Sequence, residues 1–145
     1  MENLLLSASP EWIEMGILIT RLFIGVCFVV HGLGKLGVVG PGNMHGFTEW
    51  LRSLGVPMPA VQARMAMLTE LLGGACIALG LGTRVALALV FCTMIVAMLI
   101  GHRGGGYLIT NNPPGNEYTI NLAVILAFLF VCGPGPYSLD AWLLN

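Results

Sequence analysis

Charged side chains are scarce in this sequence, which limits the classes of protein that it can encode. Only 9% of the 145 residues are Asp, Glu, Lys or Arg, 57% are hydrophobic, and the mean hydropathy is +0.87. This composition excludes a water-soluble domain with an ordinary charged surface. The net charge of −1 provides no excess of positive charge to bind phosphates, so we expect no nucleic-acid partner.

Basic residues are absent from the first sixteen positions, "MENLLLSASPEWIEMG", which instead contain Glu2, Glu11 and Glu14. A secretory signal peptide begins with a positively charged region. We therefore expect the first hydrophobic segment to be retained as part of the structure.

The four cysteines lack the spacing of a redox or zinc motif. Cys27, Cys76, Cys92 and Cys132 are far apart, with no Cys-x-x-Cys. Neither a dithiol redox motif nor a zinc site is indicated. Each cysteine fits instead the role of a small buried apolar residue.

Long apolar runs dominate what is present. A transmembrane helix needs about 20 mostly apolar residues, and the sequence contains four such runs, at about 12–32, 61–81, 85–102 and 117–133. They predict an all-α fold, an integral-membrane antiparallel four-helix bundle in which residues 1–145 form a single membrane domain.

A short amphipathic helix is predicted at about 44–54, between the first two spans. Phe47, Trp50, Leu51 and Leu54 recur with helical spacing on one side, which is typical of a helix lying at the membrane interface. Four spans imply a multi-pass protein of the cell membrane. The loops on the side of the amphipathic helix contain most of the basic residues, so the positive-inside rule favours an orientation with both termini outside.

Two ionisable residues fall near the middle of predicted spans, Arg21 in the first and Glu70 in the second. Because a lone charge at mid-span costs about 2.5–3.5 kcal/mol on insertion scales, we expect them to form an ion pair inside the bundle. Two interpretations stay open: the pair only fixes helix packing, or it faces a cavity and handles a proton or a polar group.

Small residues share the helical row of Glu70 at four-residue steps, namely Ala66, Gly74, Ala78 and Gly82. Such rows let another helix approach closely.

A second set of polar residues is expected where the spans end on the side of the 33–60 loop. It consists of His31, His102, Glu117, Tyr118, Asn121 and Lys35. Histidines and a carboxylate in a membrane pocket suit proton-coupled chemistry on a quinone, because they can donate to its carbonyl oxygens and exchange protons with water. Glu70, His31, His102 and Glu117 are the candidate proton-exchange groups, and Arg21, Lys35, Tyr118 and Asn121 the candidate binding groups.

These residues can also be interpreted as structural, without a binding pocket. Interface histidines are often ordinary polar residues, and Met94, Met98 and His102 on one side of a helix are typical of core packing. His31, His45, His102 and Glu117 could in principle converge on a metal, but their spacing is generic and we predict no metal site.

Several segments together resemble a known family. After Arg21 come "LFIGVCFVVHGLGKL", "LGVPMPA", "TELLGG", "LGLGTR" and "GPGPYSLD". In this order they are similar to the DoxX family of small four-helix membrane proteins, and the similarity extends over nearly the whole chain. Arg21, Lys35 and Glu70 match the family's Arg, Lys and Glu positions.

The resemblance implies a quinone-linked redox role. The family is named after a subunit of an archaeal thiosulfate:quinone oxidoreductase, and other members are associated with membrane oxidoreductase complexes and with resistance to oxidative or quinone stress. The sequence has no recognisable haem, flavin or iron–sulfur ligand pattern. A bound quinone or a protein partner would then supply the redox centre.

Three functional hypotheses follow. The first is a membrane oxidoreductase component that binds a quinone, or a quinone-like molecule, between its helices. The second is a non-catalytic adaptor or assembly factor for a redox partner. The third is a small transporter, which would require a homo-oligomer because four helices enclose little volume.

Overall fold

The part of the chain that the structure describes is built from helices. The computed structural model describes residues 9–144, the fold is 73% helical, and no strand occurs within that range. The elements are α1 (Pro10–Leu36), α2 (Met44–Ser53), α3 (Pro59–Leu79), α4 (Thr83–Val96), η1 (Ala97–Gly101, a π-helical turn), α5 (Glu117–Cys132) and α6 (Leu139–Leu144). Each helix that the hydrophobic pattern predicts is present, which confirms the all-α class.

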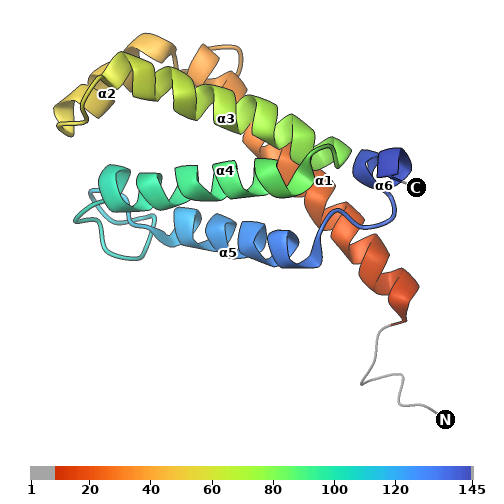
Figure 1. Ribbon diagram of the computed structural model, residues 1–145. Coiled ribbons are helices and arrows are strands. Elements are labelled where there is room, and N and C mark those ends of the chain that lie inside the picture. The colour runs from red at the N-terminus through yellow and green to blue at the C-terminus, as the bar shows by residue number, and fades with distance from the viewer. Residues whose placement is uncertain (1–8, 145) are drawn as a thin grey trace.

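The long helices pack side by side. α4 and α5 lie alongside each other, α3 packs on α4, and α1 crosses α3 (Figure 1). The N-terminal half of α1 extends past the ends of the other helices, and α6 lies near the turn between α3 and α4 (Figure 1).

Two of the four expected spans are long and apolar enough to cross a membrane, namely α1 and the continuous helix Thr83–Gly101. α5 is apolar but has 16 residues, about 24 Å at 1.5 Å per residue. α3 has 21 residues and includes Gln62, Arg64 and Glu70. That α3 and α5 also cross the membrane stays a prediction.

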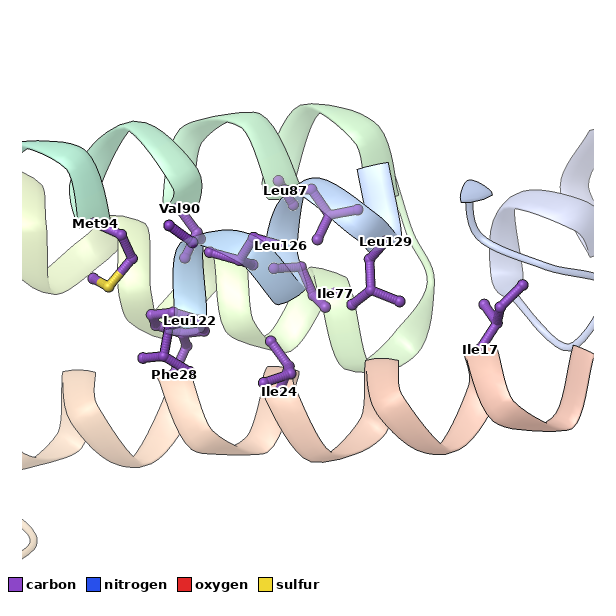
Figure 2. Close-up of a cluster of buried hydrophobic side chains, with 12 residues drawn as sticks. Ile17, Ile24, Phe28, Ile77, Leu87, Val90, Met94, Leu122, Leu126 and Leu129 are labelled. Atoms are coloured by element: carbon purple, nitrogen blue, oxygen red, sulfur yellow. The ribbon is translucent and has the colours of Figure 1, made fainter. Parts of the chain in front are cut away.

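The hydrophobic core lies where the four long helices meet. α1 contributes Ile24 and Phe28, α3 contributes Ile77, and α4 and α5 complete the cluster with Leu87, Val90, Leu126 and Leu129 (Figure 2). Phe28, Ile77 and Leu126 are completely buried. The outer surface is also apolar, since Phe23, Leu72 and Val131 are more than half exposed. An apolar exterior around an apolar core is typical of a protein that lies in lipid.

α1 and α3 approach each other closely because glycines line their contact. A Cβ added at Gly25 would lie 2.5 Å from the backbone nitrogen of Ala78, and one added at Gly32 would lie 2.8 Å from the Cβ of Leu71. A later residue of α1 thus meets an earlier residue of α3, so the two helices run in opposite directions. Of the predicted small-residue row, Gly74 and Ala78 take part in this contact.

The end of α1 differs from the sequence-based boundary. The glycines after His31 predict that the helix ends near residue 32, but it continues to Leu36 and ends at Gly37, whose φ is 80°. Gly32 does not end the helix; it leaves room for Leu71 of α3. The added turn contains Lys35.

Replacing Gly74 by Ala should destabilise the protein. The new Cβ would lie 2.7 Å from the carbonyl oxygen of Gly25 and 2.8 Å from the backbone nitrogen of Val29, so α1 would have to move away. We expect a loss of about 1–3 kcal/mol in the free energy of unfolding, measured in detergent. Gly16→Ala is the matched control, because a Cβ at Gly16 meets no atom within 4 Å. Equal stability of the two variants would contradict the close contact.

Candidate functional site

The buried carboxylate of α3 pairs with the last turn of α1. Glu70 is 4% exposed, and its side chain forms an ion pair and hydrogen bond with Lys35. The prediction that Glu70 points into the protein is confirmed. The prediction that its partner is Arg21 is wrong.

The contacts between α1 and α3 explain this correction. Gly25 lies against Gly74 and Ala78, and Gly32 lies against Leu71. Arg21 therefore lies near the end of α3, whereas the turn of α1 that reaches Glu70 is the one containing Lys35. The sequence-based depths failed because α1 is longer than predicted and extends beyond α3 at its N-terminal end.

Arg21 has a separate environment at the other end of α3. Its side chain is 1% exposed, and Nη2 donates a hydrogen bond of 2.5 Å to the carbonyl oxygen of Tyr137. A Cβ at Gly80 would overlap the guanidinium group, so only glycine fits above it. Asp140 is the carboxylate that interacts with Arg21 electrostatically, and the Nε and Nη1 atoms are buried without a hydrogen-bond partner.

Asp140 connects the C-terminal segment to the start of α4. Its carboxylate accepts hydrogen bonds from the backbone N–H of Gly82 (2.6 Å) and of Thr83 (2.9 Å) and from the Thr83 hydroxyl (2.7 Å), while its own N–H donates to the Gly80 carbonyl (2.7 Å). Burial alone would raise the pKa of Asp140, but the hydrogen bonds from Thr83 and Gly82 and the charge of Arg21 together lower it.

His31 and Tyr118 form a hydrogen-bonded pair between α1 and α5. The Tyr118 hydroxyl contacts Nε2 of His31, and the ring centroids are 5.3 Å apart at 63°. Cys27 lies one turn earlier on α1. The expectation that His31 and Tyr118 share a depth is confirmed.

The other predicted pocket residues have different neighbours. Nδ1 of His102 lies 3.2 Å from the carbonyl oxygen of Pro114, and Glu117 accepts a hydrogen bond from the backbone N–H of Ile109 (3.1 Å). Both contacts fasten the loop between η1 and α5. Asn121 is exposed. Within residues 9–144, no hydrogen bond or ion pair connects these three side chains to His31, and their proton-exchange and binding roles stay predictions.

A groove opens where α1 ends and α2 begins. Its volume is about 650 Å³, and it is lined by His31 and Lys35 of α1, Asn43 and Gly42 of the connection, and Phe47 and Trp50 of α2. The two α2 rings stack at 5.8 Å and 24°, and Nζ of Lys35 lies 5.0 Å from the Phe47 centroid. We call this the aromatic groove.

Sequence reasoning missed Phe47 and Trp50 as site residues, since it assigned them only to the apolar face of an interfacial helix. Trp50 also fits against the π-helical turn, where a Cβ at Gly101 would lie 2.8 Å from its ring. Their signal in the sequence was two aromatic residues spaced for the same helix face.

Metal ligation is not indicated by the geometry of the described residues. Across positions 9–144, no three His, Cys, Asp or Glu side chains are placed to hold an ion together. His31, the histidine of the aromatic groove, is engaged with a tyrosine hydroxyl.

Comparison with known families decides the relationship of this chain. The profile of the DoxX family matches residues 16–103, from α1 to the residues after η1, which is more than half of the chain. The chain belongs to the DoxX family. The matched range includes Arg21, Lys35, Glu70 and both aromatic groove rings, whereas Tyr118 and Asp140 follow it.

Curated relatives of this DoxX protein carry membrane and oxidoreductase names. "Putative oxidoreductase CatD" of Bacillus subtilis (strain 168) is 34% identical over 86 residues, 59% of either chain. "Inner membrane protein YphA" of Escherichia coli (strain K12) is 29% identical over 86% of this chain and 87% of its own. "Uncharacterized membrane protein Rv3486" of Mycobacterium tuberculosis (strain ATCC 25618 / H37Rv) is 26% identical over 92% and 89%. No solved structure matches.

These relationships establish the coarse class. This DoxX protein is a membrane protein, as its family and the names of two relatives indicate. The apolar exterior of its long helices agrees with that class.

Replacing Asp140 by Ala should loosen the C-terminal segment of this DoxX protein. The start of α4 would lose its capping carboxylate, at a cost of about 1–2 kcal/mol in the free energy of unfolding at neutral pH. Because the native pKa is lowered, this contribution should be complete above the ordinary pKa of 3.8 and disappear as the pH falls through the native value.

Acid titration of thermal stability measures this effect. Wild type and Glu11→Ala, which removes an exposed carboxylate of α1, should lose the contribution in acid, and Asp140→Ala should have none to lose. An identical acid dependence in Asp140→Ala and wild type would contradict the capping role.

Proposed function

We propose that this protein is the membrane subunit of a quinone-linked oxidoreductase system and that the aromatic groove binds the quinone head group. The observation that carries the proposal is the meeting of a stacked aromatic pair, an ammonium group and a hydrogen-bonded imidazole in one groove. The oxidoreductase name of one relative supports the same reaction class.

The groove suits a flat ring with two carbonyl oxygens. Its volume of about 650 Å³ falls within the 300–1,000 Å³ typical of small-molecule sites. Phe47 and Trp50 offer ring surface for stacking. Lys35 and His31 offer donors for the carbonyl oxygens, and the exposed side chains of Val30 and Val39 at the groove offer apolar surface for a hydrocarbon tail.

The chain's own residues would handle protons. A quinone held there would accept two electrons and two protons to become a quinol, and a redox protein docked at the membrane would supply the electrons. Nε2 of His31 is engaged with Tyr118, which leaves Nδ1 for the ligand. Lys35 lines the groove and the Glu70 carboxylate holds its ammonium, while the Tyr118 hydroxyl holds the His31 ring, so both donors are fixed in position at the groove. The groove is open to water, so a proton given up at Lys35 or His31 would be replaced from water at the groove.

The proposal includes the membrane arrangement in which α1, α3, α4 with η1, and α5 are four antiparallel spans. The opposite directions of α1 and α3 support it, as does the short turn that joins α3 to α4. The aromatic groove then lies near one membrane surface, where α2 rests at the interface. This position differs from the bundle interior that the sequence suggested, and Arg21 lies away from it.

Fluorescence titration tests the proposal. A short-tailed benzoquinone added to the purified full-length protein in detergent should quench tryptophan emission saturably, and Trp50→Phe should remove the saturable part. Quenching of Trp12 and Trp142, which do not line the groove, reports partition into the micelle.

The quinone affinities of two variants distinguish a residue of the groove from one outside it. His31→Gln should weaken binding about 10-fold or more, a loss of about 1.4 kcal/mol. His45→Gln, on α2 but outside the aromatic groove, should bind like wild type. Absence of saturable binding, or unchanged affinity in His31→Gln, would overturn the proposal and favour the adaptor hypothesis.

A further inference from the structure

A second groove lies on a different face of α2. It has a volume of about 450 Å³ and is lined by Leu36 of α1, by Met44, His45 and Thr48 of α2, and by Ala60, Arg64 and Met67 of α3. It shares no lining residue with the aromatic groove. We call it the Arg64 groove.

The polar part of this groove is positively charged and unneutralised. Arg64 is exposed and forms no hydrogen bond or ion pair with any residue of the described chain, and the same is true of the His45 side chain. No acidic residue lines the groove. Glu49, the carboxylate nearest His45 in sequence, is paired with Arg52, and Glu70, the one nearest Arg64, is paired with Lys35. A guanidinium at the edge of an apolar groove is a ready partner for a phosphate.

Two helix starts add to this charge. Met44 begins α2, and Ala60 is the second residue of α3, so the starts of both helices lie at the groove. Within these first turns, the Gly46 N–H is already bonded to the Asn43 side chain and the Val61 and Gln62 N–H groups to the Met58 carbonyl, so the helix starts contribute their dipoles. The positive ends of the helix dipoles therefore reinforce Arg64.

The rest of the lining is hydrocarbon. Leu36, Met44, Ala60 and Met67 are its apolar lining residues, and its surface is mainly apolar. Methionine side chains adapt to flexible apolar partners. An anionic group joined to a hydrocarbon chain matches both parts of the groove.

We infer that the Arg64 groove binds an anionic phospholipid of the surrounding membrane, with the phosphate at Arg64 and one acyl chain along Leu36 and Met67. The chain belongs to a membrane protein, so the lipid is present at high local concentration. Basic pockets between membrane helices are known to hold anionic head groups. Charge complementarity selects the lipid, because a zwitterionic head group would bring its own cation toward Arg64.

Native mass spectrometry of the full-length protein tests the inference. In a neutral detergent, phosphatidylglycerol should bind about 10-fold or more tightly than phosphatidylcholine with the same acyl chains. Arg64→Gln should abolish this preference, and Arg64→Lys should retain part of it. Arg52→Gln is the matched control, because it removes a nearby exposed cation of α2 that is already paired with Glu49.

Three results would overturn the inference. The first is equal binding of the two lipids to the wild type. The second is an undiminished preference in a folded Arg64→Gln protein. The third is binding of inorganic phosphate to the wild type as tight as that of the lipid. Quinone affinity should be unchanged in Arg64→Gln, because Arg64 does not line the aromatic groove. A result that overturns one proposal therefore does not affect the other.

Discussion

The partly buried ion pair between Lys35 and Glu70 is the interaction on which the rest of the structure depends. A charge taken out of water is costly unless an opposite charge meets it, and removing one partner leaves the other uncompensated. The pair satisfies both groups only when the last turn of α1 lies beside the middle of α3. The glycines at the contact allow this approach, since backbone atoms of α1 occupy the space of a side chain at Gly74. Charge and packing thus select one register.

This register separates two ends of the molecule. At one end, α1 presents His31 and Lys35 to the groove that α2 closes with its stacked rings, and Tyr118 of α5 holds the imidazole. At the other end, the buried guanidinium of Arg21 lies under Gly80, where Asp140 fastens the C-terminal segment to α4. The ionisable groups that suit ligand chemistry lie at the first end, and those at the second hold the chain together.

Hydrophobic periodicity predicted the helices well, because long apolar runs and an amphipathic segment leave few other structures. It predicted the wrong ion pair, because depth was inferred from span boundaries and glycine was interpreted as a helix end. Gly32 instead admits Leu71, so α1 continues to Lys35. The inferred depths did correctly predict that His31 and Tyr118 lie together. The cap formed by Asp140 on Thr83 joins residues 57 positions apart, and the aromatic groove depends on how α2 folds back; local sequence patterns specify neither.

A double-mutant cycle on the unfolding free energy tests the central claim most directly. Lys35→Met and Glu70→Gln should each destabilise the protein, and the double variant should lose less than the sum by more than about 1 kcal/mol, because the second substitution removes the stranded charge. Arg21→Met combined with Glu70→Gln should be additive within about 0.5 kcal/mol, as for sites without shared partners. Additivity for Lys35 and Glu70, or coupling for Arg21 and Glu70 in its place, would contradict the account.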